Sequence, residues 1–206
     1  MRMRVVAILL SALAGFVDAV GFIASGGFFV SFMSGNSTRL GIGIATDRHA
    51  ALLAIALILS FVTGVALASL MRGGRDGAAW SVLLLVGVAL ALAAALHRLV
   101  SPLWVLPIVA LAMGAENVAF AGQGQVVPLT YMTGTLVRVG QAIATAISGG
   151  PRWAWAPLAL MWAGLIAGGA IGARTALAIG LDALWIAAAV VIAAALAVRR
   201  LQPRPA

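Results

Sequence analysis

The sequence contains no cysteine and no lysine, and only 9% of its 206 residues are charged. Without cysteine, the chain can form neither disulfides nor thiolate metal sites. Soluble domains carry charge on about a quarter of their residues, so the scarcity of charge excludes that class. What remains is strongly apolar, with 64% hydrophobic residues and a mean hydropathy of +1.14. This composition indicates an all-α polytopic membrane protein.

All positive charge comes from 13 arginines, which outnumber the five acidic residues and give a net charge of +8. In a soluble chain this balance would suggest nucleic-acid binding. Here most arginines lie between apolar runs or near the two ends, which is the pattern that orients helices in a bilayer. The expected partner is therefore the lipid bilayer, and no nucleic acid is expected.

Eight apolar segments are predicted, and each is about long enough to cross a hydrocarbon core of roughly 30 Å as a helix. They lie near 4–24, 27–46, 50–71, 79–97, 102–121, 127–147, 153–173 and 178–198. Four segments in each half divide the chain into a first membrane repeat, 1–98, and a second, 99–206. The first segment also resembles a secretory signal peptide, but its internal counterpart predicts that it is retained.

Two polar motifs lie 99 residues apart within otherwise apolar segments. The stretch 31–46 aligns without gaps on 130–145, with seven identities and four close substitutions over sixteen positions. Chance would give roughly one or two identities, so the motifs indicate an internal repeat. The same offset pairs Asp18 with Asn117.

Small residues recur four positions apart in the third and seventh segments. Gly64 and Ala68 correspond to Gly164 and Gly168 at an offset of 100. Because this spacing lets helix backbones approach closely in lipid, we expect both segments to pack tightly against other helices.

Loop arginines predict the orientation of the chain but not the number of crossings. If all eight segments cross, eight loop arginines lie on the side of the N-terminus and three on the other, which places both termini in the cytoplasm. If the second and sixth segments re-enter instead, only six cross, and the count is again eight to three. Eight crossings make parallel repeats and six make inverted repeats. Segment length favours eight, with the motif segments locally unwound, whereas the composition of 34–38 favours a break.

Asp18 is expected to lie level with the first polar motif. Asp18 and the pair Ser34 and Gly35 are each about eight residues from the turn at 26–27, hence roughly 12 Å below the membrane surface. The carboxylate can then accept hydrogen bonds from backbone N–H groups and hydroxyls that a helix break releases. Such a network is either a cap for the broken helix or part of a ligand site.

An arginine near the middle of each motif segment, Arg39 and Arg138, is the sharper indication of function. At that depth an arginine costs on the order of 2.5–3.5 kcal/mol. The two guanidinium groups are expected to face a shared cavity and attract an anion. The alternative is that each is an internal counter-ion, Arg39 for Asp18 and Arg138 for Glu116, or extends to the headgroups.

The candidate ligand-binding residues, drawn equally from both repeats, are Asp18, Ser34, Gly35, Asn36, Arg39, Asn117, Thr133, Gly134, Thr135 and Arg138. Glu116 has no acidic counterpart in the first repeat, where Val17 occupies the equivalent position. Glu116 and Asp18 are therefore the candidates for proton handling, unless they only neutralise neighbouring arginines.

The stretch 15–22 contains Gly-Phe-Val-Asp-Ala, and 33–36 reads Met-Ser-Gly-Asn. Together they resemble the signature of the YoaK-like membrane family, a domain of unknown function (number 1275), with Ser34 in place of the usual threonine. Residues 131–142 resemble the second signature of that family. The resemblance covers nearly the whole chain and implies a small bacterial inner-membrane protein of six to eight helices, without supplying a function.

The leading hypothesis is a membrane transporter or channel for a small polar solute, expected to be anionic, bound between the two repeats. The first alternative is a non-transporting structural or scaffold protein whose polar motifs only stabilise helix hairpins. A second is a neutral-solute transporter driven by protons. No nucleophile elbow, phosphate-binding loop or metal motif is present in the sequence, so we expect neither an enzyme nor a cofactor or metal. The sequence does not determine the oligomeric state, and a homo-oligomer is compatible with it.

Overall fold

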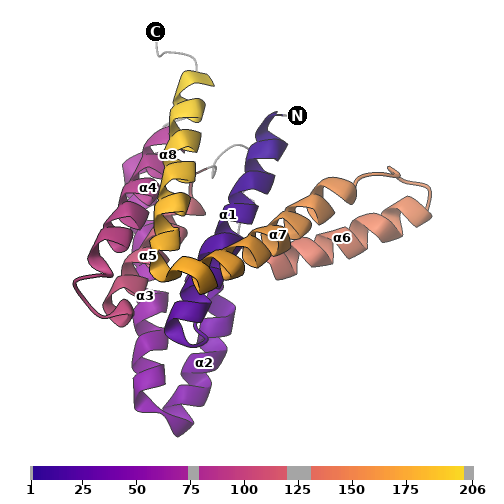
Figure 1. Ribbon diagram of the computed structural model, residues 1–206. Helices are drawn as coiled ribbons and strands as arrows, with labels where there is room; N and C mark the ends of the chain where they lie inside the picture. The colour runs from indigo at the N-terminus through magenta and orange to yellow at the C-terminus, as the bar shows by residue number, and fades with distance from the viewer. Residues whose placement is uncertain (1, 74–78, 120–130, 202–206) are drawn as a thin grey trace.

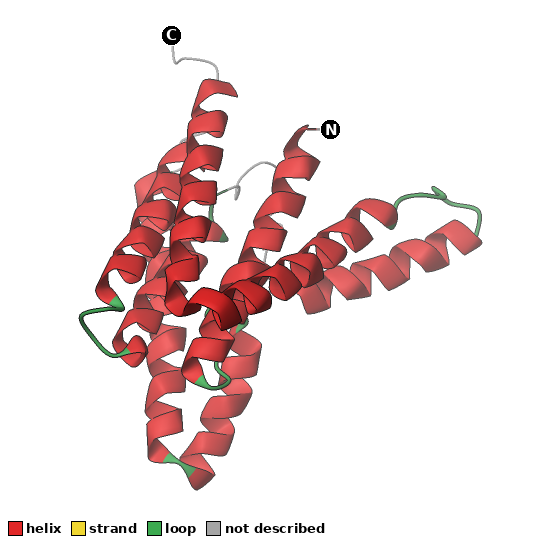
Figure 2. Cartoon of the chain, viewed as in Figure 1, coloured by secondary structure: helices red, strands yellow, loops and turns green. Residues whose placement is uncertain are grey.

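The computed structural model describes residues 2–73, 79–119 and 131–201, and every regular element within these ranges is helical (Figures 1 and 2). Alanine and leucine dominate the apolar runs and favour helix, and in lipid a helix also satisfies its own backbone groups. The α-helices are α1 (Arg2–Ser25), α2 (Met33–Thr46), α3 (Arg48–Arg72), α4 (Ala79–Leu96), α5 (Pro102–Glu116), α6 (Met132–Ile147), α7 (Ala156–Ile179) and α8 (Ala183–Leu201). A short 3-10 turn, Gly180–Asp182, joins α7 to α8.

Helix length separates the long, membrane-spanning candidates from three shorter helices, which are α5 with 15 residues and the two motif helices α2 and α6. The stretches long and apolar enough to cross a membrane are Val5–Ser25, Arg48–Arg72, Ala79–Leu96 and Ala156–Arg200, the last containing both α7 and α8. With 14 and 16 residues, α2 and α6 measure about 21 and 24 Å, short of a core of about 30 Å. The helix expected over 27–46 begins only at Met33.

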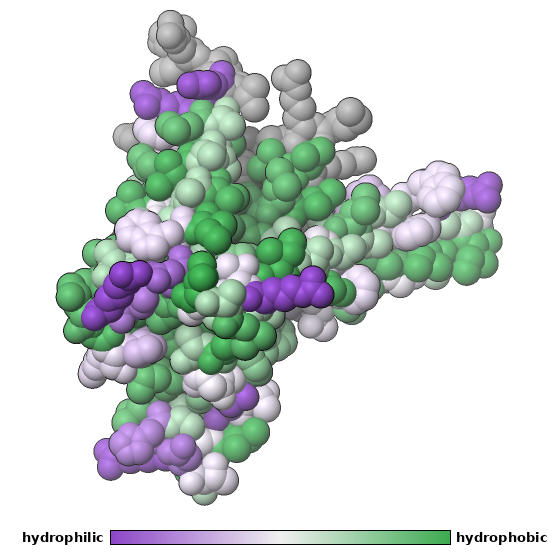
Figure 3. Space-filling model, in the orientation of Figure 1, coloured by the Kyte–Doolittle hydropathy of each residue, from purple (hydrophilic) through white to green (hydrophobic). Residues whose placement is uncertain are grey.

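The outer surface of the molecule is apolar. Large aliphatic side chains are exposed on most helices, and Leu70 and Leu177 are 78% and 77% exposed. Apolar side chains cover most of the face seen in Figure 3, with strongly hydrophilic residues in small separate groups. This surface suits lipid contact and supports a membrane location.

The pair α4 and α8 is antiparallel, with a polar contact at each end. At one end the Arg199 guanidinium lies 4.9 Å from the ring centroid of Trp80. At the other end, Asp182 accepts a hydrogen bond of 2.6 Å from Arg98 and lies 2.8 Å from His97. The Arg98 guanidinium, with the His97 ring, holds the pKa of Asp182 below its usual range. The 18 residues of α4 separate these ends by about 27 Å, close to the thickness of a hydrocarbon core.

The helices α1 and α7 run in the same direction in close backbone contact. Three glycines of α7 face three residues of α1 in the same order, Gly164 to Ile8, Gly168 to Ala12 and Gly172 to Phe16. A Cβ at Gly168 would collide with the carbonyl oxygen of Ala12, so this approach requires glycine.

The pair α3 and α5 is also parallel. Gly64 of α3 faces the carbonyl of Leu111, and Arg72, two turns later, donates to the carbonyl oxygen of Val118 at 2.6 Å. The close packing expected of the third and seventh segments is therefore present in the structure.

The directions of the packed helices bear on the number of crossings. Eight alternating crossings would make α4 and α8 parallel, whereas their contacts are antiparallel. The parallel pairs α1–α7 and α3–α5 fit both arrangements, so only the α4–α8 pair distinguishes them. The N-terminal end of α1 and the C-terminal end of α8 lie on the same side of the molecule (Figure 1). A non-helical return occupies the start of the second segment, so its helix is shorter than the segment length suggested.

Candidate functional site

The chain reverses after α1 into a non-helical segment, residues 26–32, which we call the strap. Gly26 and Gly27 have φ values of +70° and +122°, which β-carbon-bearing residues rarely adopt. The Gly27 N–H donates to the carbonyl of Phe22 at 2.8 Å and closes the end of α1. The strap then runs back along α1 to the start of α2.

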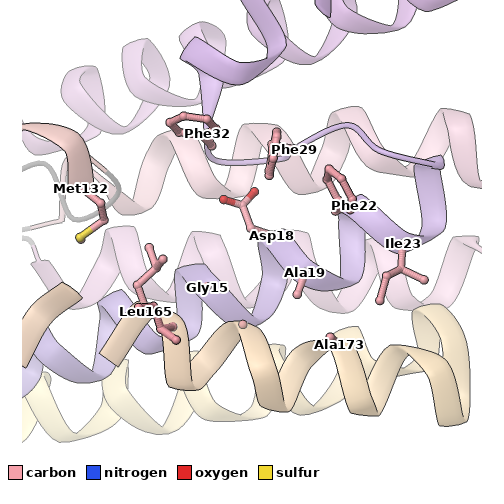
Figure 4. A pocket seen from close by; sticks show the side chains of 12 residues that line it. Gly15, Asp18, Ala19, Phe22, Ile23, Phe29, Phe32, Met132, Leu165 and Ala173 are labelled. Carbon is pink, nitrogen blue, oxygen red and sulfur yellow. The ribbon is translucent and has the colours of Figure 1, made fainter. Parts of the chain in front are cut away.

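Asp18 holds the strap against α1. Its Oδ1 accepts hydrogen bonds from the backbone N–H groups of Val30 at 2.8 Å and Ser31 at 2.7 Å. Its Oδ2 accepts from the Ser31 hydroxyl at 2.5 Å. Figure 4 shows the carboxylate directed from α1 toward the strap, between Phe29 and Phe32. Two backbone N–H groups that the non-helical strap leaves without helical partners are thereby satisfied, together with the Ser31 hydroxyl.

Asn36, near the start of α2, binds the same strap from the other side. Its amide oxygen accepts from the Phe29 N–H at 3.0 Å, and its amide nitrogen donates to the Phe29 carbonyl at 2.6 Å. The side chain is fully buried. It replaces both hydrogen bonds that the Phe29 backbone would make in a helix, so the strap is fixed by Asp18 and Asn36 together.

Arg39 is held by aromatic rings within the same hairpin. Its guanidinium lies 4.8 Å from the ring centroid of Phe28 and 5.9 Å from that of Phe22. It also lies directly against Gly27, where a Cβ would collide with it. Among the described residues Arg39 forms no ion pair with Asp18, so the rings take the place of the counter-ion that the sequence suggested.

The second motif is built differently in the residues that are described. Thr135, the counterpart of Asn36, donates to the Tyr131 carbonyl of its own helix. Asn117 donates to the Met113 carbonyl at 2.9 Å, and Arg138 is exposed. The counterpart of most of the strap falls in 120–130, outside the described residues.

Glu116 lies at the end of α5 and is fully buried. Within the described part of the chain, neither of its carboxyl oxygens has a hydrogen-bond partner. Asp18 is near enough for the two carboxyl groups to interact electrostatically. The structure therefore brings together the two acids that the sequence singled out, one from each half of the chain.

A cavity of about 460 Å³ lies beside Asp18, between the first and second halves of the chain. One wall comes from α1 and the strap, and the other from α7 and the first residue of α6 (Figure 4). The lining residues are Gly15, Asp18, Ala19, Phe22, Ile23, Phe29, Phe32, Met132, Leu165, Ile166, Gly169 and Ala173. Asp18 is the one charged residue among them.

Most of the candidate residues lie outside this lining. Ser34 is exposed, and Gly35 packs against the rings of Phe29 and Phe32. In the second half Thr133 is exposed and Gly134 packs against Tyr131. Neither Arg39 nor Arg138 lines the cavity.

The aromatic side chains of the cavity were missed by the sequence analysis. Four of the seven phenylalanines fall within residues 22–32, a clustering that could have marked an aromatic site. Phe22, Phe29 and Phe32 form a continuous row, with ring centroids 4.8 and 5.1 Å apart. They give the cavity its shape on the side of the strap.

Comparison with known proteins matches residues 6–197 to the family model described as a protein of unknown function, DUF1275. The chain belongs to the DUF1275 family. This confirms the resemblance found in the motifs.

Two curated relatives of this DUF1275 protein are described as transmembrane proteins. The UPF0700 transmembrane protein RA0705 of Rhizobium meliloti (strain 1021) is 37% identical over 95% of this chain and 87% of its own length. The UPF0700 transmembrane protein YoaK of Bacillus subtilis (strain 168) is 29% identical over 66% of this chain and 65% of its own. No solved structure matches the chain. The relatives support a membrane protein and assign no solute.

Proposed function

We propose that this protein is a membrane transporter whose small solute binds in the cavity between the two halves of the chain. The observation that carries the proposal is the cavity itself, with walls from both halves and Asp18 on one of them. A site between halves that can move against each other is the arrangement that alternating access requires.

In this proposal the two halves are inverted repeats with six crossing helices and re-entrant α2 and α6. Matched contacts support the repeat, since Gly15 faces the Leu165 carbonyl as Gly114 faces that of Phe61. Likewise Gly168 faces Ala12 as Gly64 faces Leu111, so α1 corresponds to α5 at an offset of 99, and α3 to α7 at 104. Gly64 then corresponds to Gly168 and not to Gly164. The longer α6–α7 connection accounts for the change of offset.

We place both termini in the cytoplasm, with the protein in a bacterial inner membrane. The start of α1 and the end of α8 lie on the same side of the molecule, which supports an even number of crossings. With six crossings the cytoplasmic side keeps eight of the loop arginines and the outer side three, in accord with the positive-inside rule.

The solute we propose is small and amphipathic. The cavity does not favour the anion expected from the paired arginines, because its described lining residues include a carboxylate and no guanidinium group. A cavity of about 460 Å³ with mainly apolar walls suits a compact organic molecule.

The proposal is tested by filling the cavity. Ala173 lines it, whereas Ala170 is exposed on the same helix outside the lining, so Ala173→Trp and Ala170→Trp form a matched pair. Purified wild-type protein is screened by thermal shift against a library of small organic solutes, and solutes that stabilise it are tested for uptake into proteoliposomes. We expect Ala173→Trp to abolish both responses and Ala170→Trp to retain them. If no solute stabilises the wild type, or both variants respond alike, the proposal is wrong.

A structural role is the second candidate, and a specific observation favours it. Asp18, Asn36 and Arg39 are all engaged within one hairpin, as expected if the polar motif only stabilises that hairpin. This role predicts that Asp18→Asn and Arg39→Met lower the folded yield, and that Ala173→Trp has no effect beyond stability. Solute uptake that is lost in Ala173→Trp would exclude it.

A further inference from the structure

We propose that the cavity beside Asp18 binds an organic cation whose charge is shielded by carbon, such as a quaternary ammonium group carrying an apolar substituent. This inference rests on the proposed function and adds the chemical class of its solute. Charge, aromatic composition and the hydrogen bonding of Asp18 each support it.

Charge complementarity favours a cation. Asp18 is the one charged residue among the described residues of the cavity lining, and it forms no ion pair with another of them. Arg39, the nearest candidate counter-ion in the hairpin, is placed instead over Phe22 and Phe28. An acid without a counter-ion in apolar surroundings attracts a positive ligand more strongly than the same acid would in water.

The aromatic row supplies a second attraction for positive charge. Phe22, Phe29 and Phe32 all line the cavity and contact one another in series. Aromatic faces attract cations through their quadrupole, and the effect grows when water is excluded. The protein already uses this attraction in the same cluster, where the Arg39 guanidinium lies over Phe22.

The hydrogen bonds of Asp18 select the kind of cation. Val30 and Ser31 donate to both of its carboxylate oxygens, and the strap depends on these bonds. A primary amine or guanidinium would have to compete for the same oxygens to satisfy its own N–H groups. A quaternary ammonium has no N–H group, so it gains from the negative charge without disturbing the strap.

Three probes of nearly equal size and different charge test the inference. Benzyltrimethylammonium is the cation, and neopentylbenzene is its neutral isostere, in which carbon replaces nitrogen. Benzylsulfonate is the anion. Binding of each to the purified full-length protein is measured by equilibrium dialysis against detergent of the same composition. We expect the cation to bind about tenfold or more tightly than the neutral isostere, and the anion not to bind.

Asp18→Asn is the decisive variant, since its amide oxygen can still accept from Val30 and Ser31 while the charge is removed. It should bring the affinity for the cation down to that for the neutral isostere. Asp182→Asn removes an acid from the α7–α8 turn, away from the cavity, and should leave all affinities unchanged.

Equal affinity for cation and neutral isostere in the wild type overturns the inference without any variant, even if Asp18→Asn does not fold. If both then bind and Ala173→Trp blocks both, the cavity is a solute site or an acyl-chain site of no charge preference, and the proposed function survives. If no probe binds and the solute screen also fails, both proposals are wrong.

Discussion

At the residue scale, two side chains determine the conformation of the strap. Asp18 accepts three hydrogen bonds from Val30 and Ser31, and the Asn36 amide is hydrogen-bonded to both the N–H and the carbonyl of Phe29. The sequence predicted that Asp18 would meet backbone groups released by a helix break. It placed the break within 34–38, whereas the structure has it at 26–32, because Asn36 stabilises an extended backbone that local helix propensity does not register.

Replacing Asn36 with aspartate should destabilise the protein although the two side chains have the same shape. The Asn36 amide nitrogen donates to the Phe29 carbonyl at 2.6 Å, and an oxygen in its place would face another oxygen in a fully buried site. We expect Asn36→Asp to lower the free energy of unfolding by about 1–3 kcal/mol. The measurement is thermal unfolding in detergent, followed by tryptophan fluorescence.

Ser37→Ala is the control for this variant, because Ser37 is exposed and its hydroxyl donates to the Met33 carbonyl of its own helix. It should change stability by no more than about 0.5 kcal/mol. A melting temperature for Asn36→Asp equal to that of Ser37→Ala would mean that the amide does not hold the strap.

Glu116 is a buried polar group without a partner among the described residues, and its removal should stabilise the protein. Leaving such a group unpaired costs about 1–3 kcal/mol, which Glu116→Met would recover with little change of volume. We expect a higher melting temperature for this variant. If transport also depends on a proton at Glu116, the stabilised variant should lose uptake. A lower melting temperature would show that the carboxyl group makes contacts that stabilise the fold.

At the scale of elements, α3 and α4 followed closely from the sequence, whereas the predictions at 153–173 and 178–198 missed the end of α7 by six residues and the start of α8 by five. The ranges predicted at 50–71 and 79–97 differ from α3 and α4 by at most two residues at either end. The prediction at 102–121 overran α5, which ends at Glu116, and the prediction at 27–46 merged the strap with α2. Hydrophobicity marks a segment as buried in lipid, but it does not distinguish a helix from a non-helical segment whose backbone is hydrogen-bonded by side chains.

Glycine contacts between helices should tolerate no added methyl group. At Gly168 a Cβ would collide with the backbone of Ala12, which cannot move aside as a side chain can. We expect Gly168→Ala to lower the free energy of unfolding by about 1–3 kcal/mol or more. Gly140 of α6 is exposed with open space around it, so Gly140→Ala should be neutral or stabilising by up to about 1 kcal/mol. Thermal melts monitored by circular dichroism compare the pair, and equal melting temperatures would contradict the contact.

At the scale of the whole molecule, charge counting alone could not choose between six and eight crossings, because both gave the same asymmetry. The six crossings that we propose rest instead on contacts between residues about a hundred positions apart, such as Arg98 with Asp182 and Trp80 with Arg199. Contacts of this kind depend on how the halves pack, which a hydropathy profile does not contain. A cavity between the two halves was predicted, but most of its lining residues were not, for the same reason.

Cysteine labelling tests the six-crossing topology directly, since the natural chain has no cysteine to give a background. Leu99 in the α4–α5 connection and Pro151 in the α6–α7 connection are both exposed. With six crossings they lie on opposite sides of the membrane, and with eight they share one side. We expect a membrane-impermeant maleimide to label Leu99→Cys from outside the cell and Pro151→Cys only in inverted vesicles. Labelling of both from the same side would contradict the topology.

The pairing of α1 with α7 bears on how the chain is made. The glycine of α7 that receives Ala12 is position 168, so more than 150 residues are synthesised before α1 meets its neighbour. At about 5–20 residues per second the ribosome needs about 10–30 s for that stretch. During this interval α1 lacks its contact with α7, whereas the strap and its hydrogen-bond partners Asp18 and Asn36 have already been synthesised. Docking of α1 on α7 must therefore wait until at least 168 of the 206 residues have been made, and truncated chains that stop before α7 should be substrates for membrane proteases.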